Sequence, residues 1–354
     1  MTDIKEFGFG IIGCGMIANF HAQSIKAIPG ARLVAVFDRN EDKAQAMAEE
    51  HGCEGYGDID NFLANEDVDI VTIATPSGAH LEPAIASAKA GKHIMCEKPL
   101  EVTLERIDQM IAACDENNVT LSGIFPRRFN ESTMELKKAI DDGRFGRVTL
   151  ADAYIKWYRD QAYYDNGAWR GTWALDGGGA LMNQSIHTID LLTHLAGDVV
   201  SVCAYADTLT HERIEVEDIA VAILRFKSGA LGVVEGSTTC YSTEGISAEI
   251  QISGQDGTVF MKDAVFSEWD FRNKTDDDDE IIERLGEKQD EVAMGANDPK
   301  KVNTKTFELN FIDVLDSLRK GEYPKINGQE ARKAIEIILA IYESAKNGGK
   351  EVKL

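Results

Sequence analysis

The sequence lacks the long apolar runs that place a protein in or across a membrane. No stretch approaches the roughly 18 consecutive apolar residues of a membrane-spanning helix. The first residues, MTDIKEFGFG, also lack the basic start and apolar centre of a secretory signal. These two absences predict a protein of the cytoplasm with no membrane partner.

Disulfide and metal-binding patterns are missing as well. The six cysteines are scattered, with no Cys-x-x-Cys pair and no Cys/His cluster, so we expect reduced thiols and no structural metal site. The acidic run TDDDDEIIERLGEKQDE at 275–291 lacks the spacing and the glycine of a calcium loop. We interpret it as an exposed loop or a solvated helix.

Basic residues are few compared with acidic ones. The chain has 37 Lys and Arg against 60 Asp and Glu, a formal net charge of −23. Nucleic-acid binding requires a basic surface that neutralises phosphates, so this composition excludes nucleic acid as a partner. The length of 354 residues exceeds what one hydrophobic core usually holds, which predicts two domains.

What the sequence does contain, in its first third, is a regular alternation of β-rich runs and amphipathic helical patterns. The β-rich runs are residues 7–12, 32–37, 69–74, 93–96 and 119–124. The helical patterns between them are residues 16–27, 41–50, 79–90 and 103–117. This alternation predicts a doubly wound parallel sheet as the first domain, residues 1–125.

The rhythm changes in the remainder, residues 126–354. After a helix at 131–141 and a long strand at 147–158, four strand-like runs are separated by turns, which predicts an antiparallel meander. We therefore expect an α+β second domain with an open, mostly antiparallel sheet. The last helix, 329–346, belongs to this domain, with packing back on the first domain as an alternative.

A glycine motif follows the first predicted strand. In GCGMIA, Gly13 permits a tight turn, Gly15 lets a pyrophosphate approach the backbone, and the small Ala18 allows close packing of helix on strand. Met16 and Ile17 open the helix, whose N-terminal N–H groups would face the phosphates. The pattern predicts a dinucleotide site.

Asp38 and Arg39 bear on which dinucleotide binds. Asp38 ends the second strand, 25 positions after Gly13, where an acid accepts hydrogen bonds from the adenine ribose and repels a 2′-phosphate. Arg39 either stacks on adenine, pairs with such a phosphate, or is a solvated turn residue. We predict NAD, with NADP as the alternative.

Two further motifs, ATPSGAH at 74–80 and CEKPL at 96–100, end later strands of the predicted sheet. Ligands of such folds bind at the carboxyl edge, where both motifs must lie. A lysine at that edge can donate or accept a proton, which makes Lys98 a candidate catalytic residue. The predicted cofactor contacts from these motifs are Thr75, Pro76, His80, Glu97 and Lys98.

The stretch GGGALMNQSIHTIDLL, 177–192, predicts a helix that begins with three glycines. Asn183 and His187 are four residues apart and therefore share one face. An imidazole that titrates near neutral pH suits a general base, and an amide can orient a hydroxyl group. The alternative is a helix whose polar residues satisfy buried backbone groups.

Loop residues supply the remaining candidates for substrate contact. Arg128 begins the second domain and either meets substrate oxygens or forms an interdomain salt bridge. The segment 156–171 mixes aromatic residues, which stack on sugar faces, with cations, which bind hydroxyls or carboxylates. Its candidate residues are Lys156, Tyr163, Trp169 and Arg170, with hydrophobic packing as the alternative role for about half of them.

Taken in order, GIIGCGMIA, CEKPL, the GGG…H-x-x-D helix and the V-E-D strand resemble the Gfo/Idh/MocA oxidoreductases over essentially the whole chain. The resemblance implies a Rossmann domain followed by an open-sheet domain that often mediates oligomerisation. It implies NAD(P)-dependent oxidation or reduction of a secondary alcohol of a sugar, cyclitol or sugar derivative. It gives catalytic roles to Lys98 and His187 and implies a cis Lys98–Pro99 bond.

The sequence departs from this family at Asn183, where many members carry aspartate. Asparagine cannot accept a proton, although it can still position a hydroxyl. It resembles the form found in relatives that oxidise nucleotide-linked sugar acids.

Two alternatives to a freely exchanging dehydrogenase stay open: an enzyme that traps its cofactor and transfers hydride between two sugars, and a non-catalytic nucleotide sensor. A sheet face left exposed is costly, so we expect a homodimer or homotetramer that associates through the open sheet.

Overall fold

The computed structural model describes residues 6–287 and 304–354. The chain divides into two compact units, and each is built from two segments. The first unit comprises Met1–Pro126 and Asn303–Arg332, and the second comprises Arg127–Val302 and Lys333–Leu354.

The first unit contains a six-stranded sheet in the order β3-β2-β1-β4-β5-β6. Every neighbouring pair is parallel, which confirms the predicted doubly wound sheet. The order reverses between β1 and β4, and ligands bind beside such a reversal at the carboxyl edge. The strands are β1 (Phe7–Ile12), β2 (Ala31–Phe37), β3 (Glu54–Tyr56), β4 (Ile70–Ile73), β5 (His93–Cys96) and β6 (Leu121–Gly123).

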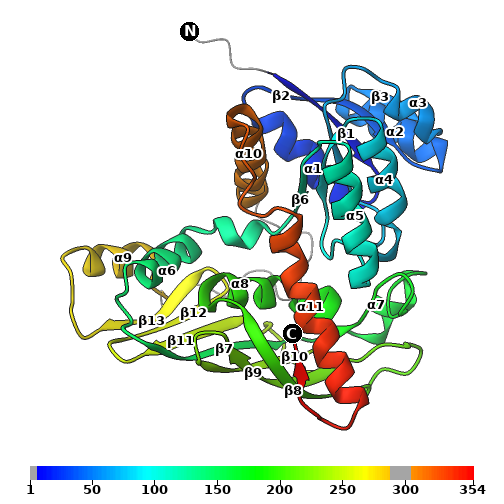
Figure 1. Ribbon diagram of the computed structural model, residues 1–354. Helices are drawn as coiled ribbons and strands as arrows, with labels where there is room; N and C mark the ends of the chain where they lie inside the picture. The colour runs from blue at the N-terminus through cyan, green and yellow to red at the C-terminus, as the bar shows by residue number, and fades with distance from the viewer. Residues whose placement is uncertain (1–5, 288–303) are drawn as a thin grey trace. The chain divides into compact units, whose positions relative to one another are not determined.

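The helices of this unit cover its sheet, and Figure 1 shows α4 beside α5. Three of them begin at a side chain that accepts a hydrogen bond from the first turn, namely Asn40, Asp58 and Thr103. The helices are α1 (Met16–Ala27), α2 (Glu41–His51), α3 (Ile59–Leu63), α4 (Leu81–Lys89) and α5 (Leu104–Glu116). The sequence patterns missed the short elements β3 and α3.

The segment 303–332 is assigned differently from the predicted boundary. Helix α10 (Thr304–Lys320) packs against α1 in the first unit (Figure 1). The Phe311 ring lies 5.7 Å from the Phe9 ring and 5.6 Å from the His21 ring. The burial of this apolar face explains why α10 clusters with the first unit. Helix α11 (Gly328–Lys346) begins in the first unit and continues into the second.

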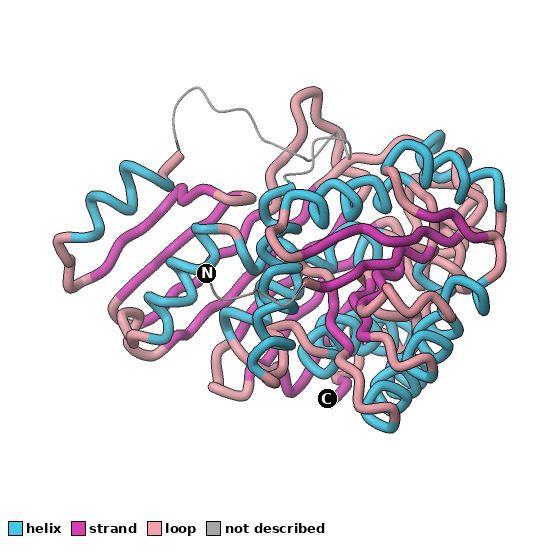
Figure 2. Tube along the Cα trace, turned by 90° about the horizontal axis from the view of Figure 1, so that it is seen from above, coloured by secondary structure: helices cyan, strands magenta, loops and turns pink. Residues whose placement is uncertain are grey.

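The second unit contains an eight-stranded sheet in the order β13-β12-β11-β7-β10-β9-β8-β14, whose strands run side by side in Figure 2. Strand β7 is parallel to β10 and antiparallel to β11. The sheet is therefore mostly antiparallel, as predicted, but the simple meander is wrong because β7 separates β10 from β11. The strands are β7 (Val148–Lys156), β8 (Val199–Asp207), β9 (Ile219–Phe226), β10 (Leu231–Ser237), β11 (Glu249–Gly254), β12 (Gly257–Lys262), β13 (Val265–Phe271) and β14 (Val352–Lys353).

One face of this sheet is covered and the other is open. A π-helical turn, η3 (Ala180–Ser185), leads into α8 (Ile186–Ala196) and lies so close to β10 that a Cβ on Gly236 would be 2.5 Å from Leu181. Along β9, Val221 and Ile223 point to the open face and are 44% and 59% exposed. The other helices of this unit are α6 (Glu131–Asp141), α7 (Gln161–Asp165) and α9 (Asp277–Leu285).

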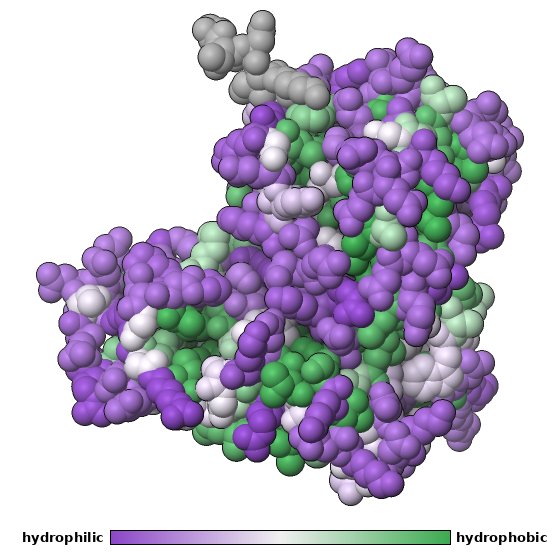
Figure 3. All heavy atoms as spheres, in the orientation of Figure 1, coloured by the Kyte–Doolittle hydropathy of each residue, from purple (hydrophilic) through white to green (hydrophobic). Residues whose placement is uncertain are grey.

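The surface reflects the composition. Hydrophilic side chains cover most of the face shown in Figure 3. Within the described ranges, no helix is long and apolar enough to cross a membrane. All six cysteines are free thiols.

The acidic run contains helix α9, and one of its carboxylates is buried. Asp278 accepts bonds of 2.8 and 2.7 Å from the Arg144 guanidinium and one of 2.7 Å from the Trp269 indole. Burial opposes ionisation of Asp278, but these donors outweigh it and hold the pKa of the carboxyl well below its usual range. The prediction of a solvated helix is wrong at this residue; the rest of the run, 288–291, lies outside the described residues.

Replacement of Asp278 tests this ion pair. We expect Asp278→Asn to lower the free energy of unfolding at pH 7 by about 3 kcal/mol, because it leaves the Arg144 cation largely buried without its counter-charge. Asp279→Asn, on the exposed neighbour, serves as the control in denaturant unfolding. The lowered carboxyl pKa contributes stability that is complete above the ordinary pKa of about 4, so the difference between the two variants should be constant at neutral pH and shrink progressively as the pH falls below about 4.

Candidate functional site

The glycine loop after β1 is shaped for close contact with a ligand. Gly13 has a φ of +96°, and a Cβ there would be 2.9 Å from the Ala74 carbonyl oxygen. At Gly15 a Cβ would meet no atom within 4 Å, so this glycine is not required by the protein's own packing. Helix α1 starts at Met16 with no side-chain cap, which leaves its first N–H groups for an anion. The loop fits a dinucleotide.

Asp38 lies beside this loop at the end of β2. Its Oδ2 accepts the Cys14 N–H at 2.9 Å, and its Oδ1 accepts the Asn40 N–H at 2.9 Å. The carboxylate is thereby fixed where an adenine ribose is expected, while Arg39 is exposed. Burial and then Asp38 raise the pKa of Cys14 to about 12, so the thiol adds no charge to the loop.

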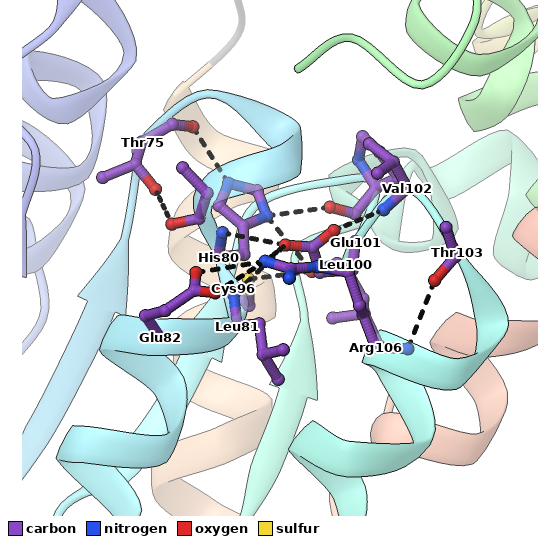
Figure 4. A network of polar contacts seen from close by, with 12 residues as sticks. Thr75, His80, Leu81, Glu82, Cys96, Leu100, Glu101, Val102, Thr103 and Arg106 are labelled. Carbon is purple, nitrogen blue, oxygen red and sulfur yellow. Dashed lines mark hydrogen bonds and ion pairs between the residues drawn. The ribbon is translucent and has the colours of Figure 1, made fainter. Parts of the chain in front are cut away.

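His80 links the two motifs at the carboxyl edge, as Figure 4 shows. Its Nε2 lies 2.9 Å from the Thr75 carbonyl oxygen and its Nδ1 lies 3.0 Å from the Pro99 carbonyl oxygen. The residue is 1% exposed. This geometry favours a role in holding the Thr75–Pro76 loop against the bend after Lys98, rather than direct contact with a ligand.

Glu97 is turned into the first unit. Its Oε1 lies 2.9 Å from Nε2 of His21, and its Oε2 accepts the Lys98 N–H at 3.1 Å. His21 is fully buried and its Nδ1 lies 3.0 Å from the Thr72 hydroxyl. The predicted cofactor contact through Glu97 is thus not favoured, because its carboxylate is already engaged below Lys98. The peptide bond between Lys98 and Pro99 is cis, as expected.

In the second unit, the three glycines are required by close backbone approach. Gly177 has a φ of +75°. A Cβ on Gly178 would be 2.1 Å from the Tyr342 hydroxyl, and one on Gly179 would be 1.9 Å from the Glu217 carbonyl oxygen. The helix then begins as the π-helical turn η3, a form often found at functional sites.

Asn183 and His187 flank a buried stretch of this helical segment. Both are partly exposed, whereas 184–186 between them are buried. The Asn183 amide donates to Asp176 at 2.5 Å, and its Oδ1 accepts the Gln184 side-chain N–H at 3.1 Å. Asn183 lies in the π-helical turn η3 and His187 in α8, so their shared face stays a prediction.

Asp176 is a residue that the sequence analysis missed. It is 1% exposed, and its Oδ2 accepts the Gly171 N–H at 2.9 Å while its Oδ1 accepts the Asn183 amide. A buried carboxylate therefore lies directly behind Asn183, the position at which the family resemblance implies an aspartate in many members. The only sequence signal was the acid that precedes the three glycines.

Three of the four residues predicted in the 156–171 segment, Tyr163, Trp169 and Arg170, lie together. The Arg170 guanidinium lies 4.4 Å from the Tyr163 ring centre and 5.7 Å from that of Trp169. Arg159, which was not predicted, lies 5.5 Å from the same Tyr163 ring. Gln184 donates to the Tyr163 hydroxyl at 2.8 Å, which connects this group to the Asn183 helix.

Two predicted substrate contacts have other partners. Arg128 is buried and donates to both carboxylate oxygens of Asp190 at 2.8 and 2.6 Å. Both residues belong to the second unit, so this pair is not an interdomain bridge. Lys156 pairs with Glu235 at 2.8 Å on the open face, opposite the face covered by η3 and α8. The geometry favours structural roles for both.

Family models match most of the chain. The model described as an oxidoreductase family with an NAD-binding Rossmann fold, GFO/IDH/MocA, matches residues 7–125. The model of the GFO/IDH/MocA C-terminal domain matches residues 133–260.

Individual relatives match at moderate identity. Myo-inositol 2-dehydrogenase of Thermotoga maritima is 34% identical over 256 residues, 71% of this chain and 74% of the relative. The WlbA dehydrogenase of Bordetella pertussis, solved with NADH and UDP-GlcNAcA, is 35% identical with a TM-score of 0.87 over 99% of both chains. The WlbA dehydrogenase of Chromobacterium violaceum, solved with the same two ligands, is 34% identical with a TM-score of 0.88 over 100% of this chain and 97% of that one.

Gly15 offers a substitution that separates ligand binding from folding. We expect Gly15→Ala to leave the melting temperature nearly unchanged, because its Cβ meets no protein atom within 4 Å. The methyl group would occupy space that the pyrophosphate needs, so the Kd for NADH should rise at least about tenfold. NADH fluorescence titration measures the Kd, and an unchanged affinity would refute this role for the loop.

Proposed function

Because the chain belongs to the GFO/IDH/MocA family of NAD-binding oxidoreductases, we propose that it is an NAD-dependent dehydrogenase of a nucleotide-linked sugar acid. The observation that carries the substrate class is the similarity, over essentially the whole chain, to two dehydrogenases solved with NADH and UDP-GlcNAcA. The inositol dehydrogenase matches a smaller share of the chain.

The charges around Tyr163 support an anionic substrate. Arg159 and Arg170 both lie against the Tyr163 ring, in a chain whose net charge is −23. Burial lowers the pKa of Arg159, and Arg170 adds to that effect. The Nε of Arg170 is buried and has no hydrogen-bond partner among the described residues. A carboxylate or phosphate of the substrate would offset both effects through charge-assisted hydrogen bonds.

The proposed reaction is a reversible hydride transfer. The C–H bond of the carbinol breaks as a hydride leaves, and the hydroxyl proton passes to a protein base. NAD, which the glycine loop and Asp38 would hold, would supply the hydride acceptor. Lys98 and His187 share the roles of general base and of donor to the developing oxyanion, and Asn183 orients the reacting hydroxyl.

A substrate screen tests the proposal. The purified protein is incubated with NAD⁺ and, separately, UDP-GlcNAcA, UDP-GlcNAc, free glucuronate and myo-inositol, and NADH absorbance is followed. We expect turnover of UDP-GlcNAcA at the highest kcat/KM. Turnover of myo-inositol alone would overturn the sugar-acid assignment. If the protein binds NADH but turns over none of these compounds, the trapped-cofactor or sensor alternative would be favoured.

The catalytic roles are tested on the substrate that the screen identifies. Lys98→Ala and His187→Ala should each lower kcat by about 100-fold or more, the usual worth of acid–base assistance. Lys89→Ala, on the exposed side of α4, is the control and should retain the kcat of the parent protein. Full turnover in both variants would contradict the mechanism.

We also propose that the chain associates with a second copy through the open sheet face. Val221, Ile223 and Leu231 are 44%, 59% and 42% exposed on neighbouring strands, an apolar surface that a partner would cover. Ile223→Asp should shift the mass measured by light scattering from a dimer or tetramer to a monomer. Ile282→Asp, an equally apolar exposed residue on α9, should not. A monomeric parent protein would refute the proposal.

A further inference from the structure

The helix that carries Asn183 and His187 begins without a capping side chain of its own. Its N-cap residue is Gly179, and the first N–H groups of any helix need acceptors from elsewhere. Glu217, just before β9, provides them. Its Oε2 accepts the Gly179 N–H at 2.9 Å and its Oε1 accepts the Leu181 N–H at 2.7 Å.

Tyr342 of α11 completes this arrangement. Its hydroxyl donates to Oε1 of Glu217 at 3.0 Å and accepts a hydrogen bond from the Met182 backbone. Its ring lies 5.3 Å from the Trp173 ring, edge to face. A buried carboxylate and a partly buried tyrosine from distant parts of the sequence therefore serve three N–H groups of one helix start. We call this pair the Glu217–Tyr342 clamp.

The glycines before the helix lie too close to this clamp to carry a side chain. The Cβ that any other residue would add at Gly178 would be 2.1 Å from the Tyr342 hydroxyl. At Gly179 it would be 1.9 Å from the Glu217 carbonyl oxygen. The backbone at the helix start thus lies against the clamp with no room for a side chain, so the clamp sets the position of the helix start.

We propose that Glu217 is a positioning residue for the reaction: its ionised carboxylate holds the start of the helix, and protonation loosens that hold. The proposal rests on the proposed function in taking Asn183 and His187 as groups that meet the substrate. Neither Glu217 nor Tyr342 is placed in contact with substrate.

The hydrogen-bond chemistry explains why ionisation matters. A carboxylate accepts all three bonds, from Gly179, Leu181 and Tyr342. A carboxylic acid carries a proton on one oxygen, so its O–H group then faces one of these N–H or O–H donors and cannot accept from it. Burial raises the pKa of Glu217 to about 7 although the three donors oppose the shift. Both forms are therefore populated at neutral pH.

Besides Glu217, the titratable groups at the clamp lie on α11, on α7 and on the segment before η3. Tyr342 lies on α11 and Tyr164 on α7, and burial raises the pKa of both, so both stay neutral near pH 7. Asp176 lies on the segment before η3 and interacts electrostatically with Tyr342. The neighbouring Asp218 instead accepts bonds from residues 209–211. The test must separate the response to Glu217 from any pH response of His187 itself.

Tyr342→Phe is the most informative variant. It removes one donor to the ionised form, together with the acceptor of the Met182 N–H, and leaves the ring and the two backbone bonds to Glu217, so the pKa of Glu217 should rise. The acid limb of the kcat profile should move to higher pH by about half a unit or more, while kcat at pH 9 stays within about twofold of the parent. Tyr205→Phe, at a tyrosine that is 71% exposed, is the matched control and should shift nothing.

Glu217→Gln provides the second variant. It mimics the protonated form in shape, so kcat at pH 8 should fall about tenfold and the step near pH 7 should disappear. The Kd for NADH should stay unchanged, because the glycine loop lies in the other unit. A merely structural defect would lower the melting temperature without shifting the pH profile in Tyr342→Phe.

A readout without turnover keeps this inference distinct from the proposed function. The Cε1–H resonance of His187, assigned by its loss in His187→Asn, should show an inflection near pH 7 that reports the ionisation of Glu217. Tyr342→Phe should shift that inflection and Glu217→Gln should abolish it. If the resonance and the kcat limb are unchanged in both variants, the positioning role is overturned. If the parent protein turns over none of the substrates, the His187 resonance alone tests the positioning role. If Glu217→Gln does not fold, Tyr342→Phe alone tests it.

Discussion

In each of the two units, the candidate functional residues depend on backbone that approaches its neighbour more closely than a side chain allows. At Gly13 the glycine loop passes the Ala74 carbonyl, and at Gly179 the helix start passes the Glu217 carbonyl, at separations that exclude a Cβ. Close approach at a helix start leaves N–H groups facing outward. In the first unit those groups remain for a dinucleotide, and in the second the Glu217–Tyr342 clamp takes them.

Hydrogen bonds hold the backbone and side chains next to the candidate catalytic residues. His21 and Glu97 lie beneath Lys98, His80 ties the bend after Lys98 to the neighbouring loop, and Asp176 holds the Asn183 amide. A buried polar group costs free energy unless its partner is correctly placed, so each pair tolerates few arrangements. That restriction is useful where a proton and a hydride must leave along defined directions.

The parts predicted well are those that local physics determines. Continuous apolar runs and the glycine motif were enough to predict the parallel sheet. The errors concern partners distant in sequence. The residues around Arg128 do not indicate that it pairs with Asp190, and those around Glu97 do not indicate its contact with His21. The central position of β7 follows from strand pairings that a strand pattern does not encode.

The same reasoning explains the asparagine at 183. The family resemblance implies an aspartate at this position in many members; in this chain a carboxylate lies one hydrogen bond further back, on Asp176, which is buried and bonded to Gly171 and Asn183. Position 183 therefore carries a neutral amide that a buried carboxylate orients. Under the proposed function, a neutral hydrogen-bonding group at this position places no like charge next to the carboxylate of a sugar acid.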